Sequence, residues 1–303
     1  MLSSDTMAQR FLTVFTPTFN RAYCLGQVYD SLVSQTRQDF IWMIIDDGST
    51  DGTRDLVSSW ISDNKIQIRY IFQDNLGMHG AHNTAYAHID TELNTCIDSD
   101  DFMPVDAIEK IATHWELHKN DAPNLAGMIA LDAYQDGKVI GQKIPDHLKV
   151  CKINDLYEKF KVTGDKKLIY RTEIVKQFPA YPIFEGEKFV PLGILYLMID
   201  QQYDLVPLNE VVCIVEYLPD GSSRNIFKQY RRHPKGFAHA RTIVMRYGVT
   251  FKQRFRSAIH FVAHNIQLKK ISFLINNPNL LLTILAIPFG IAEYFYIRYR
   301  AKD

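Results

Sequence analysis

Short apolar runs alternate with segments of helical periodicity over the first hundred residues. The runs rich in β-branched and aromatic residues, which we expect to form strands, are residues 11–16, 40–45, 66–72 and 93–97. Apolar residues recur at helical spacing within the intervening segments 25–33, 53–60 and 80–88. This alternation predicts an α/β fold with a mostly parallel sheet flanked by helices. In such sheets ligands bind beyond the carboxyl ends of the strands.

The remaining pattern divides the chain into segments. We expect further strands at residues 125–134 and 167–171, and a helical stretch at 190–199. With 303 residues, 47% apolar and 22% charged, the composition is that of a folded globular protein. The predicted organisation is a flexible N-terminus (1–10), a catalytic domain (11–220) with a nucleotide-binding half (11–104) and an acceptor half (105–220), and a basic helical region with an apolar tail (221–303).

Charge is distributed unevenly, although 34 basic and 34 acidic residues cancel. No Asp or Glu occurs between Gly221 and Ala292, and an apolar run over residues 280–292 is broken by Pro288 and Gly290. Because that run is shorter than the roughly twenty residues that span a bilayer, we expect peripheral attachment to a membrane. The alternative is that these helices pack on the protein or pair two copies in a homo-oligomer. No nucleic-acid motif accompanies the basic residues, so we do not expect nucleic acid as a partner.

The first ten residues lack the apolar core of a signal peptide. We therefore expect a cytoplasmic protein, peripheral at the inner face of the cell membrane. The four cysteines are widely spaced and form no CxxC pair, which predicts free thiols in a reducing compartment.

Polar clusters follow three of the expected strands, at residues 16–21, 46–51 and 98–101. Asp46 and Asp47 are adjacent carboxylates that repel each other unless a donor or a cation offsets the repulsion. Asp98, Asp100 and Asp101 concentrate negative charge in four residues. Hard oxygen ligands suit Mg²⁺ or Mn²⁺, which bind through one or two carboxylates together with phosphate and water. A tight turn and a helix cap at Asp101 are the alternatives without a ligand.

Four motifs stand in a fixed order along residues 11–104: FLTVFTPTFNRAYCLGQVYDSLVSQT, FIWMIIDDGSTDGT, NLGMHGAHNTA and CIDSDD. Together they resemble the nucleotide-binding half of the inverting family 2 glycosyltransferases, which have the Rossmann-like GT-A fold. The resemblance implies transfer of a sugar from a nucleoside diphosphate sugar, usually a UDP-sugar, with a divalent metal at a DxD motif. Because the tail suggests a membrane, we expect a cell-envelope or lipid-linked glycan as the acceptor.

The resemblance also assigns roles to residues at matching positions. The nucleotide cleft would be lined by Thr16, Pro17 and Asn20. The base would be bound by Asp47, with Asp46 as its less certain neighbour. The loop beside the diphosphate would include Asn75, Gly77 and Asn83. Asp98 would contact the ribose and the metal, Asp100 would coordinate the metal, and Arg224 could contact phosphate.

A transferase of this kind needs a carboxylate to deprotonate the acceptor hydroxyl. The family pattern implies an acidic motif about ninety residues past the DxD motif, where this chain has Glu185, Glu187 and Lys188. Glu187 is the first choice and Glu185 the alternative, while Lys188 stands where many relatives have a second acid. A surface loop of mixed charge is the alternative without catalysis.

Two classes of function remain open at this stage, an active sugar transferase and a catalytically silent membrane-associated protein that binds nucleotide sugars or glycans. Retention of Asp47, Asp98 and Asp100 favours the transferase. A dehydrogenase is excluded because no GxGxxG follows the first strand, and a metal-dependent pyrophosphatase is a weaker alternative. The histidines, among them His82, His233 and His264, are scattered without metal-ligand spacing, so we expect core or surface roles for them.

Overall fold

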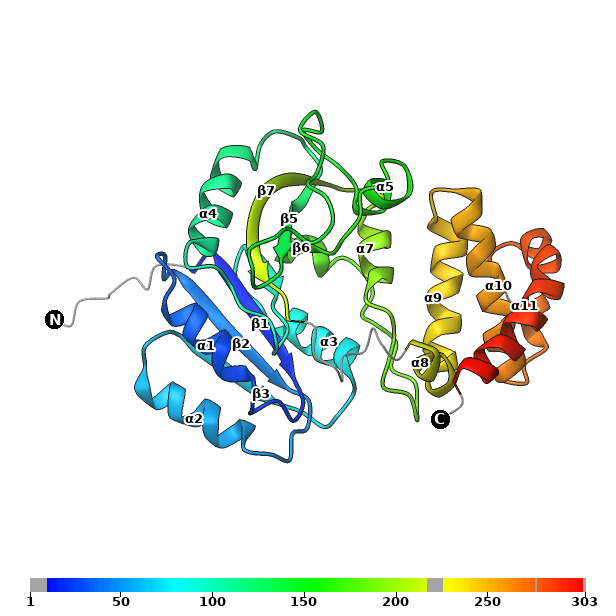
Figure 1. Cartoon of the computed structure of the whole chain (residues 1–303), viewed down its shortest axis with the longest axis horizontal. Helices are drawn as coiled ribbons and strands as arrows, with labels where there is room; N and C mark the ends of the chain where they lie inside the picture. Colours follow the sequence, from blue (N-terminus) through cyan, green and yellow to red (C-terminus); the bar gives the residue numbers. More distant parts are fainter. Residues whose placement is uncertain (1–9, 217–225, 276, 302–303) are drawn as a thin grey trace.

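The computed structural model describes residues 10–216, 226–275 and 277–301. An α/β part and a set of C-terminal helices lie side by side (Figure 1). Helix α9 (Pro234–Tyr247) lies beside α7 (Gly193–Ile199), where Ala240 packs with the core of the α/β part. The segments for which a flexible N-terminus and a domain boundary are predicted, residues 1–9 and 217–225, are outside the described residues.

A seven-stranded sheet forms the centre of the α/β part, in the order β3-β2-β1-β4-β6-β5-β7. Only β6 runs against its neighbours, while every other pairing is parallel. The prediction of a mostly parallel α/β sheet with flanking helices is therefore confirmed. The strands are β1 (Leu12–Thr18), β2 (Phe40–Asp46), β3 (Ile68–Phe72), β4 (Leu93–Cys96), β5 (Leu125–Ala133), β6 (Lys166–Arg171) and β7 (Asp204–Ile214).

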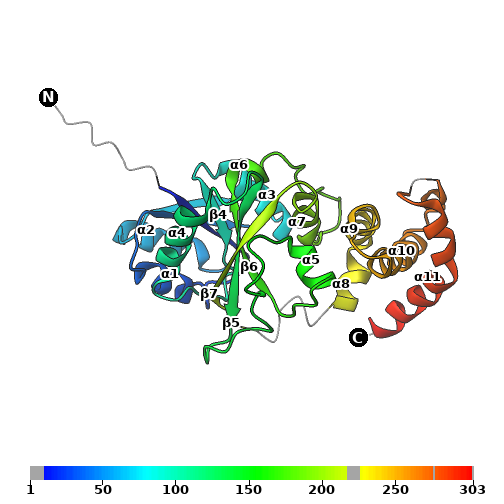
Figure 2. The same ribbon diagram turned by 90° about the horizontal axis from the view of Figure 1, so that it is seen from above.

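Helices cover both faces of this sheet (Figure 2). Every residue of β1 and β2 is buried, as expected for strands covered on both sides. Alternate side chains serve opposite faces, so that Val14 and Trp42 pack with the first layer, while Phe15 and Met43 pack with α3. The first layer contains α1 (Leu25–Val33), α2 (Thr53–Asp63) and α4 (Ala107–His118), and the second contains α3 (Met78–His88), α6 (Thr172–Val175) and α7, with α5 (Ile153–Glu158) nearby.

Strand β7 is not among the strands that the sequence pattern predicts. It contains Pro207, Asn209 and Glu210, which interrupt the apolar run on which strand prediction depends. Register shifts in its pairing with β5 accommodate the irregular segment. This strand matters for the site because it brings Cys213 beside the end of β4.

The C-terminal helices are α8 (Ile226–Arg232), α9, α10 (Phe251–Gln267) and α11 (Leu280–Arg300), with a 3₁₀ turn η2 (Ser272–Leu274) between the last two. The Thr250 hydroxyl caps α10 by accepting from the Gln253 amide at 3.1 Å, and Asn279 caps α11 by accepting from the Leu282 amide at 2.9 Å. Helix α11 is continuous through Pro288, although the sequence pattern suggested a break there.

Helix α11 packs on α10 along one side only. A Cβ atom at Gly290 would lie 2.5 Å from Cβ of Val262, so the glycine permits the close approach of the two helices. Leu282 and Ala286 complete this contact with Ala258 and Val262. The other side of α11 is exposed, and its apolar residues, which we call the α11 outer face, are Leu281, Ile284, Leu285, Phe289 and Phe295.

Candidate functional site

The ends of β1, β2 and β4 meet at one edge of the sheet, because these strands are adjacent and parallel. The register pairs Thr18 with Asp46, and the Asp47 amide donates to the Thr18 carbonyl at 2.8 Å. On the other side of β1, the Ile97 amide donates to the Phe15 carbonyl at 3.0 Å, which brings the turn after β4 to the same edge. The polar clusters seen in the sequence are therefore brought together.

Asp46 is fully buried and fixes the turn that follows β2. Its Oδ1 accepts from the Ser49 amide at 2.8 Å and its Oδ2 from the Tyr70 hydroxyl at 2.5 Å. Burial, followed by the hydrogen bond to Asp46, raises the pKa of Tyr70 to about 12, so this phenol remains a donor. Asp46 is thus committed to protein groups on both oxygens.

Asp47 holds the loop that leads into α3. Its Oδ1 accepts from the Gln73 side chain at 2.7 Å and from the Leu76 amide at 2.8 Å, and its Oδ2 accepts from the Gly77 amide at 2.7 Å. Burial raises the pKa of Asp47 in spite of these donors. The contact between Asp47 and a nucleotide base stays a prediction, while its position beneath the loop is a property of the fold.

The predicted cleft residues of β1 and its turn have different environments. Thr16 is fully buried, and its hydroxyl accepts from the Trp42 indole at 3.0 Å, so its side chain packs in the core, while its predicted place in the nucleotide cleft stays a prediction. Asn20 has a φ of 54° and joins two turns, because its side-chain oxygen accepts from the Thr50 amide at 2.8 Å. Contacts of Pro17 and Asn20 with a nucleotide stay predictions.

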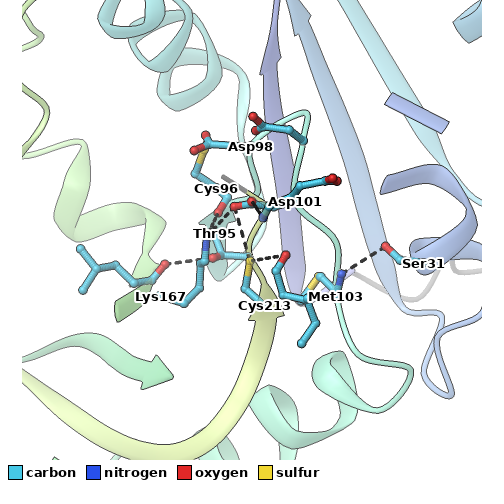
Figure 3. Close-up of polar contacts among 12 residues, drawn as sticks. Ser31, Thr95, Cys96, Asp98, Asp101, Met103, Lys167 and Cys213 are labelled. Atoms are coloured by element: carbon cyan, nitrogen blue, oxygen red, sulfur yellow. Dashed lines mark hydrogen bonds and ion pairs between the residues drawn. The ribbon is translucent and has the colours of Figure 1, made fainter. Parts of the chain in front are cut away.

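Asp101 lies in a buried polar group at the end of β4, together with Lys167 of β6 and Cys213 of β7 (Figure 3). Its carboxylate accepts from the Glu216 amide at 3.1 Å, and one oxygen lies 4.0 Å from the Lys167 amine. Burial is the main cause that raises the pKa of Asp101 to about 7. The alternative of a helix cap at Asp101 is wrong, since α4 begins after Asp106.

Lys167 provides positive charge beneath this carboxylate turn. Burial alone would lower its pKa, but neighbouring acidic groups, first Cys213 and then Asp132 and Asp101, raise the pKa well above its usual range. The amine also donates to the Cys96 carbonyl at 3.4 Å. A permanently charged amine therefore offsets part of the repulsion between the clustered carboxylates, which the sequence pattern could not show.

Asp98 and Asp100 are partly exposed in the turn above this group. Among the described residues, no three His, Cys, Asp or Glu side chains converge to enclose a metal ion. This arrangement fits Mg²⁺ or Mn²⁺, which take one or two carboxylates and obtain their other ligands from phosphate and water. Asp98 and Asp100 are the residues that would hold such an ion.

A cavity of about 170 Å³ opens beside Asp98, between α3, β4, β6 and α7. It is smaller than the roughly 300–1,000 Å³ of pockets for drug-sized ligands. Its wall combines aromatic, aliphatic and polar side chains, and the ring-bearing lining residues are Phe15, His82, Tyr86, Tyr170 and Tyr196. From the sequence, His82 is expected to have only a core or surface role, and Tyr170 is one of several tyrosines that either contact a sugar or pack in the core.

The loop of Asn75 and Gly77 contacts the segment that follows in the acceptor half. Gly77 has a φ of 81°, and a Cβ atom there would lie 2.0 Å from the Lys188 carbonyl oxygen. The Lys188 amine donates to the Asn75 carbonyl.

Asn83, predicted beside the diphosphate, donates to the Tyr181 carbonyl and accepts from the Tyr181 amide, both at 2.8 Å. Asn83 thus links α3 to this segment, and its contact with a diphosphate stays a prediction.

Glu187, the first choice for the base, is the helix cap of α9. One oxygen accepts from the Lys235 amide and the other from the Gly236 amide, both at 2.8 Å, and the residue is 6% exposed. Both oxygens of Glu187 thus bind the helix N-terminus, and a role of this residue as the base stays a prediction. Glu185 is exposed, and neither glutamate lines the cavity. Arg224 lies outside the described residues.

The sheet order, the flanking helices and the carboxylates at the strand ends define a protein of the GT-A class. Residues 13–130 match the sequence model of the family described as Glycosyl transferase family 2. The predicted resemblance to this family is therefore confirmed over these residues.

Curated relatives agree with this family. An uncharacterized glycosyltransferase from Nostoc sp. is 28% identical over 144 residues, which cover 48% of this chain and 38% of the relative. The putative teichuronic acid biosynthesis glycosyltransferase TuaG from Bacillus subtilis is 31% identical over 100 residues, which cover 33% of this chain and 39% of TuaG. The chain thus matches about two fifths of the length of these relatives.

Solved structures share the fold over nearly the whole chain. TarS from S. aureus in complex with UDP-GlcNAc has a TM-score of 0.59 at 18% identity, covering 96% of this chain and 91% of that one. A mannosyltransferase from Pyrobaculum calidifontis in complex with GDP-Man and Mn²⁺ has a TM-score of 0.55 at 17% identity, covering 98% and 84%. At these identities the likeness establishes the fold alone.

Proposed function

We propose that this chain is an inverting glycosyltransferase that moves a sugar from a nucleoside diphosphate sugar, in particular a UDP-sugar, to a hydroxyl group of a cell-envelope or lipid-linked glycan. The observation that carries the proposal is the place of Asp98. This carboxylate follows a central strand of the part that matches family 2 and also lines a cavity that has aromatic side chains in its wall. A diphosphate at the turn and a sugar ring in the cavity would then be neighbours.

Asp100 and Asp98 would hold Mg²⁺ or Mn²⁺ in this proposal. When bound, the ion would neutralise charge that develops on the departing nucleoside diphosphate. Lys167 supports the same function. Its positive charge reduces the repulsion among the carboxylates of the turn, and its amine contacts the Cys96 carbonyl and Asp101, which leaves Asp98 to bind an ion. Asp46 and Asp47 would shape the nucleotide cleft by fixing the turn after β2 and the loop of Asn75 and Gly77.

The C-terminal helices supply a second part of the proposal, attachment to the cytoplasmic face of a membrane. Helix α11 is long and apolar enough to cross a bilayer by length and composition. Its most apolar 18-residue segment has a mean hydropathy of 1.9, and 28% of that segment is buried. Because one side packs on α10 while the α11 outer face is exposed, we favour a helix that lies in the interface. Exposed Lys269, Lys270, Arg298 and Arg300 near its ends would attract anionic lipid.

A catalytically silent protein that binds nucleotide sugars is the second candidate, and one observation favours it. Both oxygens of Glu187 are occupied by the N-terminus of α9, so the first-choice base is not available in this arrangement. Glu185 would have to reach the acceptor from an exposed loop. Product formation decides between the two candidates.

The test uses the purified full chain with a panel of UDP- and GDP-sugars and Mn²⁺ or Mg²⁺. Binding is followed by thermal shift, and turnover by release of UDP or GDP with a lipid-linked glycan fraction as acceptor. The transferase predicts that a labelled sugar becomes part of the glycan. Binding without release would favour the silent protein, and release of a sugar phosphate together with a nucleoside monophosphate would indicate a pyrophosphatase. Failure of every nucleotide sugar to bind would overturn the proposal.

A further inference from the structure

The polar side chains that line the cavity beside Asp98 differ in whether the protein already satisfies their hydrogen bonds. Asn94 donates to the Tyr170 carbonyl at 3.2 Å and to the Thr172 hydroxyl at 3.1 Å. The Lys166 amine donates to four backbone carbonyls, among them those of Thr163 at 3.0 Å and Gly164 at 3.1 Å. The donor groups of these two lining residues are therefore bound to the protein, which makes them poor candidates for donating to a ligand.

Two buried lining residues differ from these. Nε2 of His82 and the hydroxyl of Tyr170 have no hydrogen-bond partner among the described residues. His82 is 1% exposed and Tyr170 is 2% exposed. A buried polar group without a partner costs on the order of 1–3 kcal/mol, so two of them around one cavity require an explanation.

The His82 ring has one defined donor and one defined acceptor. Its Nδ1 lies 3.0 Å from the Met78 carbonyl oxygen, one turn earlier in α3, and a carbonyl oxygen can only accept. Nδ1 therefore carries the proton, and Nε2 of the neutral ring is an acceptor. Burial lowers the pKa of His82, which keeps the ring neutral.

Neighbouring rings hold this orientation. The centroid of Phe15 lies 5.1 Å from that of His82, the centroid of Tyr86 lies at 5.9 Å and that of Tyr181 at 6.4 Å, all edge to face. Tyr170 is stacked on Tyr196 at 5.6 Å. The acceptor and the hydroxyl are thus fixed before any ligand arrives, and ordering them on binding costs little.

We propose that this cavity binds a single sugar ring, with His82 accepting a hydrogen bond from a ring hydroxyl and Tyr170 completing the contact. The volume suits one ring, the aromatic side chains in the wall, such as Tyr86 and Tyr196, suit its apolar faces, and a fixed acceptor selects a group that can donate. The inference rests on the proposed function for its nucleotide sugar. The ring could belong to the donor or to the terminal unit of the acceptor, since both present the same hydroxyl chemistry.

The experiment compares His82→Phe, which keeps a ring and removes the acceptor, with His82→Gln, which retains an acceptor oxygen. His88→Phe is the matched control, because His88 lies in the same helix and makes the same bond to the carbonyl four residues earlier, at 2.9 Å, but is exposed. Tyr170→Phe tests the second contact. Thermal unfolding of each variant identifies any loss of folding.

Binding of UDP, UDP-GlcNAc and methyl glycosides of glucose, galactose and N-acetylglucosamine is then measured by calorimetry with Mn²⁺. If the ring is that of the donor, His82→Phe weakens UDP-GlcNAc about tenfold and leaves UDP unchanged. If it is that of the acceptor, the variant leaves both nucleotides unchanged and weakens a methyl glycoside on the UDP-loaded protein by a similar factor. In both cases His82→Gln recovers part of the affinity and His88→Phe has no effect.

A folded His82→Phe variant that binds all sugar-bearing probes as the wild type does would overturn the inference. If the wild-type protein does not bind UDP, the result counts against the proposed function instead. Binding of the methyl glycosides to the free protein would then still test the cavity. The ¹⁵N resonances of His82 give an independent readout. An Nε2 signal that shows a protonated nitrogen in the free protein would contradict the assigned acceptor.

Discussion

The amide of Gly77 donates to the Asp47 carboxylate at 2.7 Å, while the other side of the same glycine lies against the backbone of Lys188. This relationship joins the turn after β2 to the segment that caps α9. The loop between Gln73 and Gly77 is therefore fixed from both halves of the α/β part. Small changes at Gly77 are expected to affect the whole edge of the sheet.

Replacement of Gly77 by alanine should be more destabilising than the same change at a glycine with the same φ. Gly137 also has a φ of 81°, but a Cβ atom there meets nothing within 4 Å. Gly137→Ala should therefore cost about 1–2 kcal/mol from left-handed strain alone. Gly77→Ala adds the clash with the Lys188 carbonyl and should cost at least about 2 kcal/mol more, as measured by urea unfolding. Equal costs would show that the loop does not need this close approach.

Asp100→Asn should remove metal-dependent turnover while leaving the fold intact. The change replaces a charged hard ligand by a neutral one, and loss of metal stabilisation should lower activity by about 100-fold or more. EDTA should have a similar effect on the wild type. Asp106→Asn is the control, because Asp106 is a surface residue that pairs with Lys110 at 3.1 Å. Unchanged turnover by Asp100→Asn would contradict the metal assignment.

Glu187→Ala should lower stability, because the amides of Lys235 and Gly236 would lose their acceptor. Loss of a helix cap with two charge-assisted bonds should cost about 2 kcal/mol. Glu185→Ala should leave stability unchanged, since Glu185 is exposed. Thermal unfolding measures both. If Glu185→Ala instead removes turnover without loss of stability, the exposed glutamate is the base.

The sequence predicts the nucleotide half of the fold well, for a physical reason. Residues 12–18 and 40–46 are buried on both faces, so their continuous apolar runs and the polar turns after them are direct signals of strands and strand ends. The same signals cannot show side-chain direction. Thr16 lies one register position from Phe15, yet it faces Trp42 in the core on the opposite side of the sheet.

Long-range contacts explain the other differences. Glu187 becomes a helix cap only because α9 begins 47 residues later in the chain, at Pro234, and Lys167 meets Asp101 only because β6 inserts between β4 and β5. A local sequence pattern cannot predict such contacts between residues far apart in the chain. His82 and Tyr170 have the same origin, since the cavity exists only where α3, β6 and α7 come together.

Asp200 should make stability depend on pH. It accepts from the amides of Ile153 at 3.2 Å and Asn154 at 2.7 Å, yet burial dominates and raises its pKa to about 7. The folded protein then binds a proton that the unfolded chain releases near pH 4, so the stabilisation by this group is present below pH 4 and is lost as pH rises to 7. Relative to Asp200→Asn, the free energy of unfolding of the wild type should fall by up to about 4 kcal/mol across this range. A constant difference between pH 4 and 7 in urea titrations would contradict the raised pKa.

Charges on the α11 outer face should release the protein from membranes. Leu281 and Leu285 are 69% and 52% exposed and lie one turn apart, so Leu281→Glu with Leu285→Glu places two carboxylates where apolar side chains would enter lipid. Each change removes hydrocarbon groups that would be buried in lipid, where each contributes about 0.8 kcal/mol to the binding free energy. Binding to vesicles containing phosphatidylglycerol should therefore weaken by at least about tenfold. Substitution is preferable to deletion of the helix, because Leu282 and Ala286 form part of the core with α10.

Leu117→Glu is the matched control, since Leu117 is 71% exposed on α4, far from this face in the chain. Cosedimentation of wild type and double variant with the vesicles measures binding, and added salt should weaken the wild type because Lys269, Lys270, Arg298 and Arg300 act through charge. Equal binding by the double variant would exclude the outer face as the anchor. If the wild type does not bind vesicles but sediments as a dimer that the two glutamates dissociate, the same face instead joins two copies of the chain.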